Sequence, residues 1–467
     1  MTFNSLEFVF VFLPLVVAAH GLALGRSNGA AKGILLLASL AFYALSSLAT
    51  LPILAASFAL NALVARQIHR NEAGAARRRW LVFGLVADVG ALAVFKYSAF
   101  VLENVAAASG RAAPHVAFAL PLGLSFFTIQ QVMYLVDCYE GLITPAPLLD
   151  HAVAMSFFPT ISAGPITRAT DFYPQLDDRA RVRADAGARG LLLFAIGLVK
   201  KVVLAQALQT LVEWAYKDVG ALRPLEAWLT SIGFTFQIYF DFSGYTDMAL
   251  GIGLMLGLSL PPNFNSPLQA TSIIDFWNRW HMTLTKFITT YVYTPMARAG
   301  GRLTFRKAMA ISLLSMTIAG LWHGPAWTYV AFGFMHGVGI VINHVWRKAK
   351  RKLPRWLAWG LTFAYVNAAF VLFRAKDLGE GFHVLGTMVG VHPGAGAFAA
   401  AGGLRRLAVV VPITVFSLAL IRFKSSNELA ETFKPSRRWA VACAIAFVVC
   451  AVLMNTSGMK GFVYRDF

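Results

Sequence analysis

Charged residues are scarce in this chain. Only 13% of its 467 residues are Asp, Glu, Lys or Arg, whereas a soluble domain carries about 25%. Hydrophobic residues make up 58%, so too few polar side chains remain to cover a globule that faces water. This composition excludes an ordinary soluble fold and indicates a protein that lies in a lipid bilayer.

Cysteines and cofactor motifs are also rare. The three cysteines form no disulfide framework and no CxxC pattern, and we interpret them as small apolar residues of packed or lipid-facing helices. The sequence contains no HExxH, no Walker loop and no GxSxG element. A zinc site is conceivable from His281, His323 and His336, but their spacing is not diagnostic. We therefore expect no bound metal and no bound cofactor.

Acidic residues are the minority, with 22 against 41 basic residues and a net charge of +19. In a soluble protein this excess would suggest nucleic-acid binding. Here the basic residues gather at the ends of apolar runs, as the positive-inside rule requires, so we expect no nucleic-acid partner. The basic connections that we place on the cytoplasmic side are Arg66–Arg79, Arg168–Arg189, Arg298–Lys307, Arg347–Arg355 and Arg422–Arg438.

Apolar runs divide the chain into candidate membrane spans, each of which needs about 20 residues. They predict an all-α multi-pass membrane protein with about eleven transmembrane helices, shorter re-entrant or interfacial helices, and a single domain over residues 1–467. The first run lacks a preceding basic region, so we interpret it as a retained span, not a signal peptide. The runs are 6–24, 34–50, 52–65, 80–101, 118–136, 190–212, 227–260, 308–346, 356–373, 404–421 and 439–454.

Two runs contain predicted breaks, at Pro52 and at Gly324–Pro325. The run 227–260 is too long for one straight span, so we expect it to be tilted or to break near Gly244. Basic connections flank 308–346 on both sides, so this run must enter and leave the membrane on the cytoplasmic side. It is therefore predicted to form a helix hairpin whose apex lies at membrane depth. Broken backbone is tolerated there only when it is buried in protein or lines a wet cavity.

His323 lies at this predicted apex, at the bottom of a cavity. Ionisable residues within membrane segments are costly and often mark function. A neutral imidazole can take a proton from a hydroxyl while that hydroxyl attacks a thioester. A structural histidine bonded to nearby backbone is the alternative. Trp322 and Trp327 flank His323, and they either line an acyl slot or pack.

A second polar and aromatic stretch runs from Asp275 to His281. On a helix, Asp275 and Arg279 are four residues apart and can pair, and Trp277 and His281 share a face. An amphipathic interfacial helix would account for the Trp and Arg residues but does not require His281. We expect His336 to pack or to form a hydrogen bond. The stretch 158–165 is expected to be a tightly packed turn or re-entrant loop.

Several motifs together resemble the membrane-bound O-acyltransferases, with the bacterial alginate O-acetyltransferase type as the most similar branch. The residues Phe3–Pro14 and Phe95–Tyr97 are similar to the same branch. The resemblance covers nearly the whole chain. The motifs, in chain order, are Pro121–Phe127, Ala163–Arg168, Phe236–Ala249, Asn263–Asn265, Phe276–His281 and Gly320–Gly324.

The resemblance implies a ring of helices around a central funnel in the bacterial inner membrane. It assigns the catalytic role to His323, as general base or nucleophile, and a supporting role to His281. Tyr239, Asp241 and Arg279, which lie in the shared motifs, become candidates for an acyl channel.

The resemblance also implies substrates and partners. The acyl group, for which acetyl is favoured, would come from a cytoplasmic thioester, either acetyl-CoA or an acyl-carrier phosphopantetheine. The acceptor would be a hydroxyl of an extracytoplasmic polysaccharide or of a periplasmic partner protein. Arg298, Arg302, Arg306 and Lys307 could bind donor phosphates, although simple topological charge is the favoured interpretation.

Two alternatives remain open. The residues Phe276–Met282 and Gly339–His344 are similar to the D-alanyl transferases of teichoic acid synthesis, so fold analogy does not fix the acyl group. A transporter or flippase with discontinuous helices would also place polar residues in broken spans. Such proteins often contain two related halves, which this sequence does not show.

Overall fold

The computed structural model describes residues 1–72, 74–112, 114, 118–178, 183–299, 301–398, 403–420 and 423–456. Helices and no strands occur in these residues, so the predicted all-α class is confirmed. Parts of the predicted connections Arg66–Arg79, Arg168–Arg189, Arg298–Lys307 and Arg422–Arg438 lie outside the described residues. The chain folds into two compact units, and each draws on separate stretches of sequence. The expected single domain stays a prediction.

Seven helical segments within the described ranges are long and apolar enough to cross a membrane, so the multi-pass character is confirmed. One of these segments, Asn28–Arg70, contains both α2 and α3, so the number of segments is not the number of transmembrane helices. The predicted total of about eleven transmembrane helices therefore stays a prediction. The seven segments are Phe8–Arg26, Asn28–Arg70, Ala75–Ser109, Ala184–Ala215, Trp327–Lys348, Arg355–Arg374 and Arg437–Thr456.

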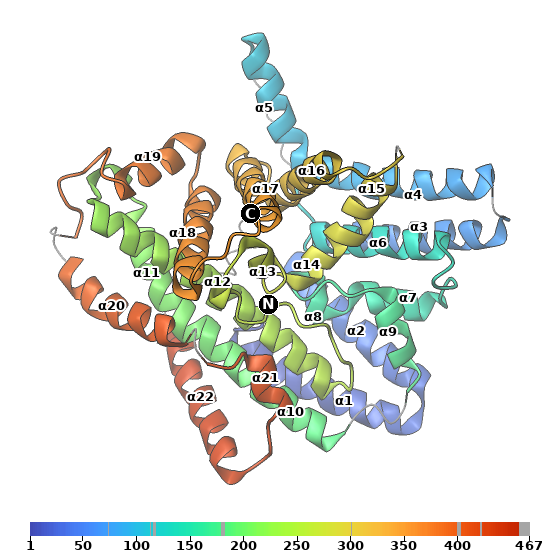
Figure 1. Cartoon of the computed structure of the whole chain (residues 1–467). Coiled ribbons are helices and arrows are strands. Elements are labelled where there is room, and N and C mark those ends of the chain that lie inside the picture. The colour runs from blue at the N-terminus through green and yellow to red at the C-terminus, as the bar shows by residue number, and fades with distance from the viewer. Residues whose placement is uncertain are drawn as a thin grey trace. The chain divides into compact units, whose positions relative to one another are not determined.

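The first unit comprises Met1–Ile196, Tyr245–Pro262 and Ala430–Gly461. Its helices include α1 (Leu13–Arg26), α2 (Asn28–Ser47), α3 (Leu51–Arg70), α4 (Ala75–Leu92), α5 (Ser98–Ser109), α6 (Leu124–Tyr139), α7 (Leu148–Ser156), α8 (Phe158–Ile161), α9 (Ala169–Leu176), most of α10 (Ala184–Val199) and α22 (Arg437–Thr456). The helices α3, α4 and α6 pack side by side (Figure 1).

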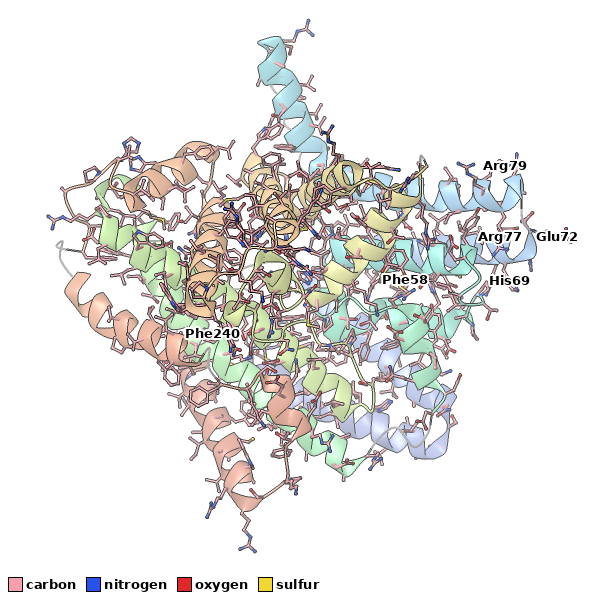
Figure 2. All side chains as sticks on the ribbon, in the orientation of Figure 1. Phe58, His69, Glu72, Arg77, Arg79 and Phe240 are labelled. Carbon is pink, nitrogen blue, oxygen red and sulfur yellow. The ribbon has the colours of Figure 1, made fainter. Side chains whose placement is uncertain are left out.

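The predicted break at Pro52 is confirmed. Helix α2 ends at Ser47, and α3 begins at Leu51 with the proline in its first turn, where the missing N–H costs no helical hydrogen bond. At the other end of α3, His69 and Glu72 lie beside Arg77 and Arg79 of α4 (Figure 2). This turn belongs to the basic connection Arg66–Arg79.

Helix α6 differs from the predicted span 118–136. It begins at Leu124 and has 16 residues, a length of about 24 Å, which is less than the ~30 Å of a hydrocarbon core. Most of its side chains are buried within the protein, so α6 is a core helix of the first unit. The expected tight turn at 158–165 is confirmed, because a Cβ on Gly164 would lie 2.6 Å from the Cα of Thr160.

The second unit comprises Gly197–Gly244, Asn263–Leu429 and Phe462–Phe467, of which the last stretch is not described. Its helices are η5 (Lys200–Ala205), α11 (Gln206–Ala215), η6 (Val219–Ala221), most of α12 (Pro224–Met255), η7 (Pro267–Gln269), α13 (Ile273–Trp277), α14 (Met282–Phe287), η8 (Ile288–Tyr293), α15 (Thr294–Arg298), α16 (Phe305–His323), α17 (Trp327–Lys348), α18 (Arg355–Arg374), α19 (Leu378–Met388), α20 (Gly403–Leu420), the start of α21 (Ser426–Glu431) and the end of α10.

Of the two alternatives for the run 227–260, a tilt or a break near Gly244, the break is wrong. Helix α12 is continuous over 32 residues, about 48 Å, so a span of this length must tilt to fit a bilayer. A Cβ on Gly244 would lie 2.7 Å from the carbonyl oxygen of Gly197. The glycine therefore lets two segments of the second unit approach closely, and it does not interrupt the helix.

The predicted helix hairpin is confirmed. Helix α16 ends at His323 and α17 begins at Trp327, and the two helices pack against each other along their length (Figure 1). They cross most closely at Gly320 and Gly333, where a Cβ on Gly320 would lie 2.7 Å from the Cα of Gly333. The depth of the hairpin apex in the membrane stays a prediction.

The glycine contact generates a stability prediction. We expect Gly320→Ala to lower the free energy of unfolding by about 1–3 kcal/mol, because a methyl group at this crossing forces the two backbones apart. The thermal unfolding midpoint in detergent measures the effect. Gly360→Ala in α18 is the matched control, since no atom lies within 4 Å of its Cβ position, and it should leave the midpoint unchanged or raise it. Equal midpoints for both variants would contradict the close-contact interpretation.

Candidate active site

His323 is the last residue of α16 and is only 4% exposed. Aromatic rings surround it, with ring centroids at 5.1 Å for Trp322, 5.9 Å for Phe332 and 5.4 Å for Phe373. Gly324, the next residue, has extended backbone, so α16 ends directly at His323. The site around His323 is therefore a largely aromatic enclosure at the end of a helix.

His281 adopts a left-handed backbone conformation, with φ 44° and ψ 50°. This region is uncommon for residues other than glycine, and strained residues cluster at functional sites. Two backbone hydrogen bonds hold the turn, from Met282 N–H to the Asn263 carbonyl at 3.0 Å and from Asn265 N–H to the Arg279 carbonyl at 2.9 Å. The short segment 263–265 thus fixes the conformation of His281.

The rings of the two histidines lie close together. Their ring centroids are 6.4 Å apart, and the centroids of the Phe242 and Trp322 rings lie 4.8 Å and 6.1 Å from that of His281. A separation of 6.4 Å is too long for a direct hydrogen bond between imidazoles. Two hydrogen bonds of about 2.8 Å each could instead connect the rings through one oxygen atom. The structure therefore brings together the two residues that the sequence motifs selected.

The side chain of Asn263 is buried next to His281. Its Oδ1 accepts hydrogen bonds from the backbone N–H of Thr283 at 3.2 Å and from the Thr283 hydroxyl at 2.9 Å. The same oxygen lies 3.1 Å from Nδ1 of His281. Asn263 was part of a shared motif, but sequence analysis gave it no role, because 18 positions that include two short helices separate it from His281.

The expected common face of Trp277 and His281 is wrong. Helix α13 ends at Trp277, so no continuous helix reaches His281. The Trp277 indole N–H donates instead to Nδ1 of His336 at 3.2 Å, which confirms the expected structural role of His336. Trp277 and Trp280 are 5% and 1% exposed, so these tryptophans pack inside the protein. The interfacial location of this stretch stays a prediction.

The other sequence candidates have clear positions. Arg279 pairs with Asp275 at 2.7 Å, as expected, and Tyr239 packs its ring against Trp280 at 6.4 Å. Asp241 is buried and forms an ion pair with Lys201 of η5. The sequence did not identify Lys201, because only the fold brings η5 beside α12.

The two tryptophans beside His323 differ. Trp322 is 9% exposed and contacts both histidine rings, whereas Trp327 at the start of α17 is 53% exposed. Trp322 is therefore the better placed of the two to line an acyl site. No group of three or more His, Cys, Asp or Glu residues within the described ranges is arranged to hold a metal ion.

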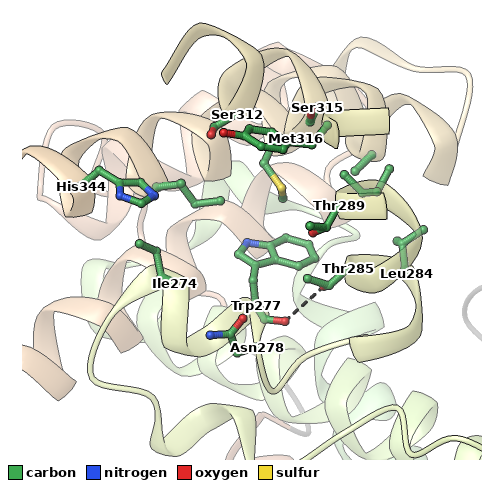
Figure 3. Close-up of a pocket in the computed structure, with 14 residues that line it drawn as sticks. Ile274, Trp277, Asn278, Leu284, Thr285, Thr289, Ser312, Ser315, Met316 and His344 are labelled. Atoms are coloured by element: carbon green, nitrogen blue, oxygen red, sulfur yellow. Dashed lines mark hydrogen bonds between the residues drawn. The ribbon is translucent and has the colours of Figure 1, made fainter. Parts of the chain in front are cut away.

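A cavity of about 160 Å³ lies beside α16 (Figure 3). Ser312, Ser315, Met316 and Ala319 line it from α16, and this spacing defines one face of a helix. His323 is four residues beyond Ala319, on the same face and about 6 Å further along the helix. The rest of the lining is mostly apolar and comes from Ile274, Trp277, Asn278, Leu284, Thr285, Ile288, Thr289, Tyr293, Ile340 and His344.

Known proteins are similar to most of this chain. Residues 88–376 match the MBOAT, membrane-bound O-acyltransferase family. The chain is 38% identical over 425 residues to the peptidoglycan O-acetyltransferase of Helicobacter pylori, covering 84% of this chain and 80% of the relative. It is 35% identical over 398 residues to the probable alginate O-acetylase AlgI of Azotobacter vinelandii, covering 83% and 78%. The teichoic acid D-alanyltransferase of Bacillus subtilis is 31% identical over 272 residues, covering 55% and 69%.

The buried ion pair generates a prediction. We expect Lys201→Met to lower the free energy of unfolding by about 3–5 kcal/mol, because it leaves the Asp241 carboxylate buried without its cation. The double variant Lys201→Met/Asp241→Asn should recover much of this loss, since it removes both charges. Thermal unfolding midpoints in detergent compare the three proteins. A double variant less stable than the single variant would contradict this account of the pair.

Proposed function

Because the chain belongs to the membrane-bound O-acyltransferase family, we propose that it transfers an acetyl group from a cytoplasmic thioester to an extracytoplasmic hydroxyl. The chain is an acyltransferase, and relatives over most of its length are named O-acetyltransferases or O-acetylases. The observation that supports this reaction in the present chain is the pair of buried histidines, whose ring centroids lie 6.4 Å apart, a separation that one hydroxyl oxygen could bridge.

His323 has two chemically reasonable roles in this reaction. As a general base, it takes the hydroxyl proton while the oxygen attacks the thioester carbonyl and the carbon–sulfur bond breaks. As a nucleophile, it first accepts the acetyl group from the thioester and then passes it to the hydroxyl. Both roles require an imidazole that is held in a fixed position and shielded from water, as His323 is at the end of α16.

The cavity beside α16 suggests a route for the donor. Arg298, Arg302 and Arg306 are exposed near the start of α16, at the end of the hairpin opposite His323. A donor that carries phosphates, such as coenzyme A or a carrier phosphopantetheine, would find cations there. Its thioester arm would then lie along the lining face of α16, which leads to His323.

The acceptor is proposed from the relatives. The Helicobacter pylori relative is named for peptidoglycan and the Azotobacter vinelandii relative for alginate. We therefore propose a polysaccharide acceptor, reached directly or through a periplasmic partner protein, and location in a bacterial inner membrane. D-alanyl transfer is the second candidate, but that relative matches 55% of the chain, against 83–84% for the acetyl-transferring relatives.

Substitution of His323 tests the proposed reaction. We expect His323→Ala to reduce transfer of labelled acetyl from a thioester to a polysaccharide by about 10²–10⁴-fold, because the proton acceptor or nucleophile is lost. Thermal unfolding and donor binding should remain close to those of the wild type. His69→Ala is the control, since His69 is exposed at the end of α3. A transfer rate of His323→Ala equal to that of the wild type would refute the proposal. If the wild-type protein itself leaves the thioester donor intact, the result would favour a transporter.

Substitution of Ala319 tests the donor route. We expect Ala319→Phe to lower kcat/KM for the donor by about tenfold or more, because the larger side chain fills a cavity of about 160 Å³ on the path to His323. Leu314→Phe is the matched control, since Leu314 is 50% exposed on the same helix and does not line the cavity. Steady-state kinetics with varied donor separate the two variants. Equal kcat/KM values would exclude this route.

A further inference from the structure

The hydrogen bonds at Asn263 determine which nitrogen of His281 carries a proton. A backbone N–H can only donate, so the side-chain atom that accepts from Thr283 N–H must be the oxygen of the Asn263 amide. That oxygen also lies 3.1 Å from Nδ1 of His281. Two acceptors would repel each other at this distance, so Nδ1 carries the proton and donates to Asn263.

The other ring nitrogen of His281 is consequently a lone-pair acceptor. In a neutral imidazole with a proton on Nδ1, Nε2 carries none. Nε2 is buried and has no hydrogen-bond partner among the residues that the structure describes. A buried polar atom without a partner is costly, and a catalytic role is one of the reasons for which native proteins retain such an atom. The atom belongs to the ring whose centroid lies 6.4 Å from that of His323, a separation that one oxygen atom could bridge with two hydrogen bonds.

We propose that Asn263 is a positioning residue that keeps His281 protonated at Nδ1, so that its Nε2 accepts the hydrogen of the acceptor hydroxyl. This inference rests on the proposed acetyl transfer. A hydroxyl has a single hydrogen and can donate it to only one histidine. The arrangement therefore selects the nucleophile from the two roles proposed for His323.

The resulting reaction balances in two steps. In the first step, the unprotonated nitrogen of His323 attacks the thioester carbonyl, a carbon–nitrogen bond forms, the carbon–sulfur bond breaks, and the thiolate leaves while the other nitrogen of His323 keeps its proton. In the second step, the hydroxyl oxygen attacks the acetyl carbon, its hydrogen moves to Nε2 of His281, and the carbon–nitrogen bond breaks, which restores His323. His281 then gives its proton to the thiolate, so that the products are the acetyl ester and the thiol and both residues return to their starting states.

The structure also explains why this task requires an asparagine amide at position 263. The backbone around Asn263 and His281 is tied by the Met282-to-Asn263 hydrogen bond, and the left-handed turn aims the ring at the amide oxygen. Loss of the oxygen would free the ring to exchange its proton between the two nitrogens. In a related catalytic arrangement, the wrong histidine tautomer lowers kcat by about 10⁴-fold although the geometry persists.

A double-mutant cycle tests the proposal. We expect Asn263→Leu to slow transfer of acetyl to the polysaccharide by about 10²-fold or more in the wild-type background. In the His281→Ala background, the same substitution should have little further effect, because Asn263 acts only through His281. Thermal unfolding midpoints identify folded variants. An equal loss in both backgrounds would show a merely structural role and overturn the proposal.

A rapid-quench measurement separates the two steps. With labelled thioester, Asn263→Leu should acetylate the protein as fast as the wild type but pass the label on slowly, whereas His323→Ala should take no label. Asn263→Asp retains an acceptor oxygen, so it should transfer acetyl to the polysaccharide faster than Asn263→Leu. This variant also tests the proposal if Asn263→Leu does not fold. Thr283→Val, which removes another donor to the same oxygen, should transfer at nearly the wild-type rate.

Three outcomes would overturn the inference. They are slow acetylation of a folded Asn263→Leu protein, equal rates for Asn263→Asp and Asn263→Leu, and a loss in Thr283→Val as large as that in Asn263→Leu. None of these outcomes affects the proposed function, because a wild-type protein that acetylates a polysaccharide establishes it. A wild-type protein without any transfer would refute the proposed function itself.

Discussion

The close crossing of α16 and α17 is the constraint on which the site depends. Gly320 and Gly333 let the two backbones approach at a distance that no larger residue permits. The hairpin can therefore close three residues after His323, and the imidazole lies inside the protein. A wider hairpin would move the broken backbone after His323 towards lipid, where unsatisfied N–H and C=O groups cost several kcal/mol each.

The sequence predicted this hairpin well, because its signals are local and strong. Basic residues at both ends of 308–346 required a return to the same side, and Pro325 marked the turn. The ordered motifs identified the family, and within them His281 and His323 could be paired although 42 positions of sequence separate them. The pairing of Asp275 with Arg279 also followed, since it needs only one helical turn.

The errors arose where distant segments decide a local conformation. Helical periodicity predicted a single helix over Asp275–His281, but α13 ends at Trp277. A backbone hydrogen bond from Met282 to Asn263 then holds His281 in the left-handed conformation. The length of the run 227–260 left a break near Gly244 as one of two alternatives, yet this glycine serves a close contact with Gly197 in a continuous helix. Neither contact leaves a periodic signal in the sequence, so both required the fold.

Both histidines lie where a helix ends, and this position has a physical reason. Side chains inside a helix point in fixed directions, and most of them pack against neighbouring residues. His336 is an example, since its ring packs against those of Phe276 and Phe332. At the end of α16 and in the turn after α13, the backbone can aim a ring independently of the helical repeat. The cost is a set of backbone groups that need partners, and the 263–265 segment supplies them at His281. Stable helices thus form the frame of the site, while the ends of these helices provide the two histidines, whose ring centroids lie 6.4 Å apart.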